Sequence, residues 1–256
     1  MKKRYYILIA VLSYLFFTLG NMPAAKVISL AEQNARLPVK FYGIQGSVWS
    51  GSANKVTIKG QPPIDNIEWS INPAMLLLAS INGEVKGNIK NQNVVGNINI
   101  SASGTISASD IRARIDAKIM QDLIKMPLGE LGGVFNINIT SLELRPEGLP
   151  KVTANIKWKN ANLTFVESVD LGFINLDIDT NDNDQLIANI SNTKGQLSLS
   201  GKASLDNKKA YDANFSITPE KNANDNIRQS IAMFARRQTD GSYLVKRKGN
   251  LRDLGF

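Results

Sequence analysis

An alternation of apolar and polar residues with a period of two is the feature that most constrains the fold of this chain. It recurs after residue 38, in the segments 95–102, 111–119, 135–140, 174–179, 197–205 and 211–217. Successive side chains of a strand point to opposite faces, so each segment places aliphatic side chains on one face and polar ones on the other. Turn signals recur along the chain about every 8–14 residues, for example at Asn82-Gly83, Ser103-Gly104 and Asp206-Asn207. The pattern predicts antiparallel strands with one solvated face.

About a dozen one-faced strands cannot remain a flat sheet, because their apolar face has to be covered. We therefore expect a mainly β fold with one large curved, mostly antiparallel β-sheet, arranged as a groove, a sandwich or a partly closed barrel. Few short helices are expected, at 24–35 (continuing the helix before it), 73–80, 120–125 and 224–236. In the last, Arg236 and Arg237 would lie at the C-terminal end, where the helix dipole favours cations. No linker rich in Pro, Gly or Ser interrupts the chain, which indicates one β-rich domain over 23–256.

The N-terminus carries a basic and then an apolar segment. Lys2, Lys3 and Arg4 precede a run without charge that continues to Ala25. A helix over residues 5–22 would be roughly 27 Å long, enough to cross a bilayer. The sequence predicts a cytoplasmic tail over 1–4, a transmembrane signal-anchor helix over 5–22 and a translocated domain beyond it, since positive charges stay in the cytoplasm. A cleaved signal peptide is the alternative, but no small-x-small cleavage site follows the run.

Composition removes several classes of function. The chain has 256 residues and contains neither cysteine nor histidine. This excludes Ser-His-Asp and Cys-His catalysis, Cys/His zinc sites and disulfides. The net charge is +8, but residues 27–218 hold 18 basic and 18 acidic residues, so the excess lies at the two ends. A nucleic-acid-binding protein would spread its basic residues over a binding face, so no nucleic-acid partner is expected.

Three other groups of residues could carry chemistry. Asp177, Asp179, Asp182 and Asp184 form the densest carboxylate cluster, but they lack the Gly and Glu of an EF-hand loop, so we expect a solvated turn and no metal site. Trp158 lies between Lys157 and Lys159 and is expected in the core rather than stacked on nucleic acid, because strand neighbours point to opposite faces. The basic run 246–248 is either an ordinary strand end or a contact for anionic lipid headgroups or an acidic partner.

The three tryptophans stand in distinctive blocks. The blocks are Gly46-Ser47-Val48-Trp49-Ser50-Gly51, then Trp69-Ser70-Ile71-Asn72-Pro73-Ala74-Met75-Leu76, then Trp158-Lys159-Asn160-Ala161. In this order, after an apolar N-terminal segment, they resemble type II secretion system protein N, the general secretion pathway protein N family. The segments 170–172, 195–197 and 241–245 fit the same family. We expect structural roles for the motif residues, with glycines at sharp turns and tryptophans as anchors of the covered face.

The resemblance implies a single-pass protein of the inner membrane of Gram-negative bacteria, with its N-terminus in the cytoplasm and its main domain in the periplasm. Such proteins are accessory parts of the machine that exports folded proteins across the outer membrane. The resemblance implies a non-enzymatic scaffold without catalytic residues or cofactors. The implied partners are other type II secretion subunits, namely platform proteins of the inner membrane and the outer-membrane secretin, together with membrane lipid.

Two other functions remain open from the residues. An AsmA-like lipid-handling protein also combines an inner-membrane helix with a curved β-groove, and a continuous open aliphatic trough would favour it. A periplasmic carboxylate-dependent hydrolase would need two buried carboxylates in one pocket. The alternation places most acidic residues on the solvated face, which argues against the hydrolase.

Overall fold

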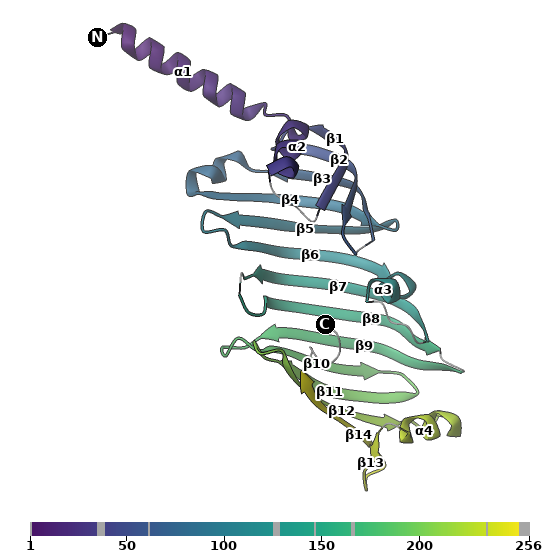
Figure 1. Ribbon diagram of the computed structural model, residues 1–256. Helices are drawn as coiled ribbons and strands as arrows, with labels where there is room; N and C mark the ends of the chain where they lie inside the picture. The colour runs from purple at the N-terminus through teal and green to yellow at the C-terminus, as the bar shows by residue number, and fades with distance from the viewer. Residues whose placement is uncertain are drawn as a thin grey trace. The chain divides into compact units, whose positions relative to one another are not determined.

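The computed structural model describes residues 2–34, 39–60, 62–124, 129–145, 147–164, 167–233 and 235–250. The fold is mainly β, with an open antiparallel sheet of 14 strands in chain order, except that β14 precedes β13 (Figure 1). This confirms the predicted antiparallel, mainly β fold, and the sheet is not closed into a barrel. The chain divides into two compact units, Met1–Gly104 and Thr105–Phe256, which are described separately.

The described residues of the first unit form five strands, two α-helices and a short 3₁₀-helix. The strands are β1 (Val39–Gly46), β2 (Ser50–Ile58), β3 (Ile64–Ile71), β4 (Ser80–Ile89) and β5 (Gln92–Ser101), and the helices are α1 (Lys2–Gly20), α2 (Ala24–Asn34) and η1 (Pro73–Leu78). Each strand pairs antiparallel with the next one along the chain. The pairing follows from the short turns between one-faced segments.

A small apolar core holds β1 to β3 together. Ala53, Val56 and Ile67 are buried, and partly buried side chains such as Phe41 and Trp69 pack against them. The register sets Phe41 opposite Val56 and Ala53 opposite Ile67. These apolar side chains therefore share one face of the strands.

The N-terminal segment forms two helices instead of one. The expected helix at 24–35 was to continue the preceding helix, but α1 ends at Gly20 and α2 starts at Ala24. The sequence between them ends at Pro23, and a proline disfavours helical backbone in the residue before it. Lys2, Lys3 and Arg4 open α1. Among the residues with a described placement, no helix is both long and apolar enough to cross a membrane.

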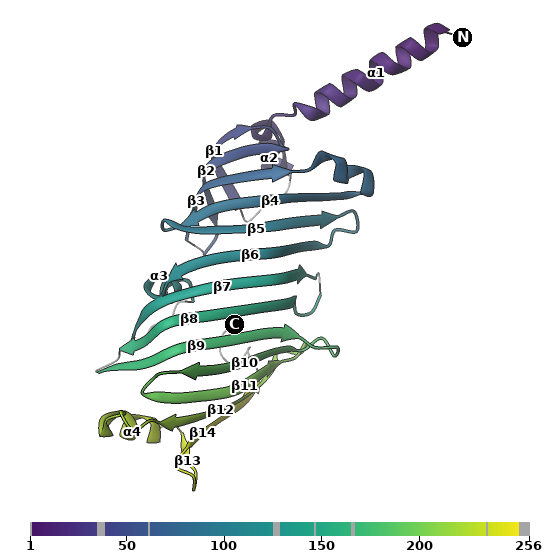
Figure 2. The same cartoon turned by 180° about the vertical axis from the view of Figure 1, so that it is seen from behind.

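Two backbone contacts attach the residues just before α2 to the turn after β1. The Val48 amide donates to the Met22 carbonyl at 3.0 Å, and Pro23 forms a β-bridge with Ser47. Farther along α2, Glu32 accepts a hydrogen bond from the backbone amide of Phe41 on β1. Figure 2 shows α2 against the strands from the reverse side. The helix is thus fixed to β1 and to the turn after it.

In the second unit, the residues with a described placement form nine strands and two helices. The strands are β6 (Ile106–Asp116), β7 (Glu130–Leu144), β8 (Lys151–Thr164), β9 (Ser168–Thr180), β10 (Leu186–Thr193), β11 (Leu197–Leu205), β12 (Ala210–Pro219), β13 (Arg236–Arg237) and β14 (Tyr243–Asn250). From β6 to β12, each strand pairs antiparallel with its chain neighbour, and β14 pairs with both β12 and β13.

The helices of the second unit are α3 (Ala117–Leu123) and α4 (Asp225–Ala232). Asn224 caps α4 by accepting a hydrogen bond from the Ile227 amide. The prediction that Arg236 and Arg237 end this helix is wrong, because both belong to β13 and pair with Leu244 and Tyr243. The predicted residues Ala35, Lys125 and Phe234 lie outside the described residues.

Candidate functional site

The first two tryptophan blocks meet at the turn between β1 and β2. Gly46 pairs with Gly51 across this turn, and Gly51 also faces Trp69 on β3. The Trp69 indole Nε1 donates to the carbonyls of Ser47 at 3.2 Å and Val48 at 3.1 Å. These two carbonyls lie in the turn, so the indole ties β3 to it. A buried indole N–H needs such a partner.

Both glycines of this turn are required by close packing. A Cβ atom on Gly51 would lie 2.5 Å from the Trp69 ring and 2.7 Å from the Gln45 carbonyl oxygen. Gly46 has a φ of +80°, and a Cβ there would lie 2.6 Å from the Ser50 carbonyl oxygen. Larger residues are excluded at both positions by sterics and, at Gly46, also by backbone conformation. At both positions the residue type is thus fixed by the close packing of the turn.

The rest of the second block forms η1. Asn72 caps it by accepting a hydrogen bond from the Ala74 amide, and Pro73 is its first residue, where a missing N–H costs nothing. The Trp49 carbonyl accepts a hydrogen bond from the Ile71 amide, which links the two blocks again. Leu76 is exposed. Apart from Leu76, the motif residues of the first unit thus shape one backbone junction.

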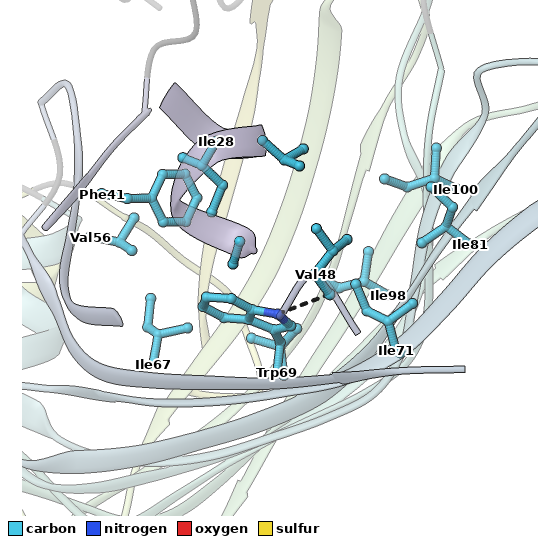
Figure 3. Close-up of a pocket in the computed structure, with 14 residues that line it drawn as sticks. Ile28, Phe41, Val48, Val56, Ile67, Trp69, Ile71, Ile81, Ile98 and Ile100 are labelled. Atoms are coloured by element: carbon cyan, nitrogen blue, oxygen red, sulfur yellow. Dashed lines mark hydrogen bonds between the residues drawn. The ribbon is translucent and has the colours of Figure 1, made fainter. Parts of the chain in front are cut away.

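An apolar cavity of about 390 Å³ lies beside this junction (Figure 3), and we call it the α2 cavity. Side chains of α2 and of the apolar face of β1 to β5 line it. The lining residues are Ala24, Val27, Ile28, Phe41, Val48, Val56, Ile67, Trp69, Ile71, Ile81, Gly83, Val85, Ile98 and Ile100. No charged residue is among them. This composition suits an apolar ligand.

The α2 cavity is open where α2 does not cover the strands. Ala24 is buried, whereas Val27 and Ile28 are half-buried. Ile81 on β4 and Ile98 and Ile100 on β5 retain 39%, 38% and 37% of their exposure. Large aliphatic side chains clustered at such exposure mark a surface that contacts another apolar group. Sequence reasoning predicted the helix but missed the cavity, although Ala24, Val27 and Ile28 have the spacing of one helix face.

The third tryptophan block lies in the second unit. Trp158 on β8 faces Phe135 on β7, with ring centroids 4.8 Å apart, and its Nε1 donates to the Gly132 carbonyl at 2.8 Å. Lys157 and Lys159 are exposed on the opposite face. Trp158 is half-buried and packs on the apolar face of the sheet, where it contacts Phe135.

A bulge in β8 explains the residues that follow Trp158. Asn160 has a φ of +50°, and the register with β9 shifts between Trp158 and Ala161. A Cβ on Gly133 of β7 would lie 2.4 Å from the Asn160 carbonyl oxygen. Ala161 is fully buried opposite Gly172. Asparagine tolerates the left-handed region better than most residues, which fits this position.

The later family segments also meet in space. Two hydrogen bonds join Asp170 and Gln196. The Asp170 backbone amide donates to Gln196 Oε1, and the Gln196 backbone amide donates to the Asp170 carbonyl. The Asp170 carboxylate accepts from the Gly172 amide at 2.8 Å. These contacts fasten the start of β9 to the start of β11. The polar residues here stabilise the backbone, which is a structural role.

The carboxylate cluster forms separate contacts. Asp177 accepts hydrogen bonds from Asn155 and Asn175, Asp179 accepts one from Thr153 at 2.9 Å, and Asp184 pairs with Arg145 at 3.0 Å. In the part of the chain that the structure describes, no group of three acidic side chains is close enough to hold a metal ion.

A second apolar cavity, of about 430 Å³, lies under α4 in the second unit. Ile227 and Ile231 of α4 are buried and pack against Tyr243 of β14, Val169 and Leu197. Unlike the α2 cavity, this one also has polar lining, including Glu167, Asn226 and Gln229. Two of these polar groups bond each other, since Asn226 donates to Glu167 at 2.6 Å. The cavity under α4 is therefore less suited to a purely apolar ligand.

The basic run 246–248 lies on β14 next to β13. Its three side chains are exposed, as are Arg236 and Arg237. Lys248 forms an ion pair with Asp212 at 2.8 Å on the neighbouring strand. The run is thus an exposed, mainly basic part of the last long strand of the sheet.

A comparison with models of protein families shows which family the chain belongs to. The model of type II secretion system protein N matches residues 38–246. The chain belongs to the type II secretion system protein N family. The match spans both units and contains all three tryptophan blocks, which confirms the resemblance seen in the sequence. No curated protein and no solved structure matches the chain.

Membership in this family makes the protein a component of type II secretion. The match starts after α2, so it includes the strands of the α2 cavity but leaves out the helix that covers it. The motif residues of the family shape turns, a bulge and a stacked aromatic pair. Their geometry gives the family motifs a structural basis.

Proposed function

We propose that the protein is an accessory, non-enzymatic scaffold of the type II secretion system, fixed in the inner membrane by its N-terminal segment and exposed to the periplasm. The observation that carries this proposal is the family match over residues 38–246. The basic start and apolar run of residues 2–22 support membrane anchoring with the N-terminus inside. The motif residues support a scaffold, because they bond to backbone or pack within the sheet.

The scaffold would act by offering its sheet to other subunits, either inner-membrane platform proteins or the outer-membrane secretin. The turn after β1 suits such a contact, since glycine packing and the Trp69 indole hold its backbone in one conformation. A rigid surface loses little conformational entropy on binding. The sheet edges at β1 and β13 are further candidates, because edge strands present unpaired backbone groups.

The test is a deletion strain assayed for exported enzymes. We expect periplasmic cargo to accumulate and secretion to fall, and the full-length gene to restore export. Photocrosslinking from Ser47 in the turn should capture a platform subunit or the secretin, while the same probe at Lys208 in the β11–β12 turn serves as a distant control. Normal secretion without cargo accumulation would remove the main support for this function.

The lipid-handling function of AsmA-like proteins is the second candidate. One observation favours it, namely the open aliphatic α2 cavity in the first unit. A deletion strain that secretes normally but has an altered lipid composition in its outer membrane would favour lipid handling over secretion.

A further inference from the structure

We propose that the α2 cavity binds one acyl chain of an inner-membrane phospholipid, with α2 as its cover. The proposal deepens the functions above by naming a ligand class and its site. It rests on the proposed membrane anchoring only for the source of the lipid.

The lining of the α2 cavity selects an apolar ligand. Among the described lining residues, the one side-chain hydrogen-bond donor is the Trp69 indole, which already donates to two backbone carbonyls. A polar ligand would therefore lose its hydrogen bonds to water without gaining new ones. The volume of about 390 Å³ lies in the range of small-molecule sites.

The arrangement of the lining suits a long, unbranched ligand. Lining residues come from every strand of the first unit, from Phe41 on β1 through Val56 and Ile67 to Ile98 and Ile100 on β5. Five neighbouring strands span roughly 19 Å across the sheet. Figure 3 shows Phe41 and Val56 on one side of Trp69 and the isoleucines of β4 and β5 on the other. An extended acyl chain fits along such a row better than a compact ligand.

Chain order indicates where the ligand comes from. Only three residues separate α1 from α2, and Ala24, the first residue of α2, lines the cavity. The Met22 carbonyl is bonded to the turn after β1. If residues 5–22 cross the membrane, the α2 cavity lies within a few residues of the lipid. Membrane phospholipid is then the apolar ligand present at the highest local concentration.

The mouth of the α2 cavity is formed by Ile81, Ile98 and Ile100. The cross-strand pairs Ile81–Ile100 and Gly83–Ile98 place these side chains together. Their partial exposure leaves apolar surface in water, and covering it with a ligand is favourable. On the opposite face of β4, Glu84 and Lys86 form an ion pair of 2.6 Å, so that face is polar. The two faces of one strand thus provide a test position and a control.

Photocrosslinking in living bacteria tests the site. The full-length chain would carry benzoylphenylalanine at Ile98 or, as the control, at Glu84. Mass spectrometry of the purified, digested protein should find a phospholipid adduct at Ile98, with a yield about tenfold above that at Glu84, as expected for an apolar against a charged position. Three outcomes would overturn the proposal. They are equal yields at both positions, an adduct with free fatty acid alone, and crosslinks only to protein, including a second copy of the chain.

A variant pair then tests the chemistry of the mouth. With the probe at Ile100, Ile98→Asp should lower the lipid adduct about tenfold, because a carboxylate opposes an apolar ligand, while Ile98→Val should keep it. Resistance to proteolysis shows whether each variant is folded. If Ile98→Asp fails to fold, Ile28→Trp replaces it, since the larger ring fills the cavity from the helix side. If folded Ile98→Asp or Ile28→Trp protein still forms the lipid adduct, the proposed acyl site is wrong.

The same cells separate this proposal from the proposed function. Fractionation reports whether the chain is in the inner membrane, and the secretion assay reports export. A lipid adduct at Ile98, together with unimpaired export in the deletion strain, would support the acyl site while the secretion role fails. If export depends on the chain but no lipid adduct forms at Ile98, the secretion role is supported and the acyl site is refuted.

Discussion

At the scale of single residues, two glycines with the same backbone conformation differ in what surrounds them. Gly46 has a φ of +80° and Gly104 a φ of +81°. A Cβ on Gly46 would lie 2.6 Å from a carbonyl oxygen, whereas a Cβ on Gly104 would meet nothing within 4 Å. We expect Gly104→Ala to lower the free energy of unfolding by about 1 kcal/mol, through left-handed strain alone.

Gly46→Ala adds a steric conflict to the same strain. We expect a further loss of about 2 kcal/mol, as for overpacked sites. Urea unfolding of both full-length variants measures the difference. Equal losses for Gly46→Ala and Gly104→Ala would show that close packing at the turn contributes nothing.

Asp240 provides a prediction for the pH dependence of stability. Its carboxylate accepts hydrogen bonds from the Ser242 hydroxyl at 2.6 Å and the Ser242 amide at 2.9 Å, and these bonds lower its pKa below the ordinary value. A lowered folded-state pKa stabilises the protein above the unfolded pKa, and this contribution is lost as the pH falls through the folded value. Asp240→Ala should therefore lower the urea midpoint at about pH 6, and the gap to the natural protein should narrow as the pH falls below the ordinary pKa of an aspartate.

Asp240→Asn is the matched control, because it removes the charge and keeps an oxygen that accepts hydrogen bonds. Its loss of stability at about pH 6 should be smaller than that of Asp240→Ala. A gap between Asp240→Ala and the natural protein that stays constant across the acidic range would contradict a charge-dependent contribution.

The residue types in the motifs indicate where each residue lies in the fold. They do not indicate which groups each residue contacts. The glycines of the first block were expected at sharp turns, and Gly46 and Gly51 lie at one. The bond from Trp69 to the turn of the other block was not predicted, because nothing in a period-two pattern fixes which carbonyl an indole reaches. Leu76 was grouped with the motif but is exposed.

At the scale of elements, α4 stabilises the second unit through one face. Ile231 retains 3% of its exposure, whereas Met233, just after the helix, retains 88%. We expect Ile231→Ala to lower the free energy of unfolding by about 3 kcal/mol, through lost burial and a new cavity. Met233→Ala, the control, should change it by less than about 0.5 kcal/mol. Thermal or urea unfolding distinguishes the two, and similar effects would mean that α4 does not pack as described.

Strands were predicted more accurately than helix ends. Strict alternation over several residues is typical of half-buried strands and does not match the period of a helix. Five of the six alternating segments lie in strands to within one residue, but the prediction for 111–119 is wrong at its end, because β6 stops at Asp116 and α3 begins at Ala117. The prediction at 224–236 failed at its end, because the pairing of Arg236 with Leu244 outweighs the helix dipole. The helix at 24–35 exists but is separate from α1. The α2 cavity could not be predicted, because the apolar face of a helix does not indicate how much of the neighbouring strands the helix covers.

At the scale of the whole molecule, the charges at the N-terminus predict its orientation. Replacing Lys2, Lys3 and Arg4 with glutamate removes the positive charges that favour a cytoplasmic N-terminus. A C-terminal alkaline phosphatase fusion, active only in the periplasm, should lose about tenfold activity in this variant. Replacement by other basic residues is the control and should keep full activity. High activity in the glutamate variant would contradict the proposed orientation.

The sequence indicated the mainly β, antiparallel character of the molecule but left three arrangements of its strands open. The reason is physical, because alternation reports which face of each strand is apolar and carries no information on what covers that face. Whether a sheet closes depends on twist and stagger, which accumulate over many strands. Pairing of the terminal strands cannot be inferred from any single segment.

Within each unit, strands pair almost entirely with their neighbours along the chain, and this order would favour folding if the chain crosses a membrane before it folds, as we propose. Each strand finds its partner already synthesised and only a short turn away, so pairing closes small loops at low entropic cost. An N-terminal segment that leaves the translocation channel first could pair before the later strands appear. The short strand β13 must wait, because its partner β14 emerges after it. The topology thus permits the strands to fold one after another, so that no long unpaired chain has to accumulate during the proposed export.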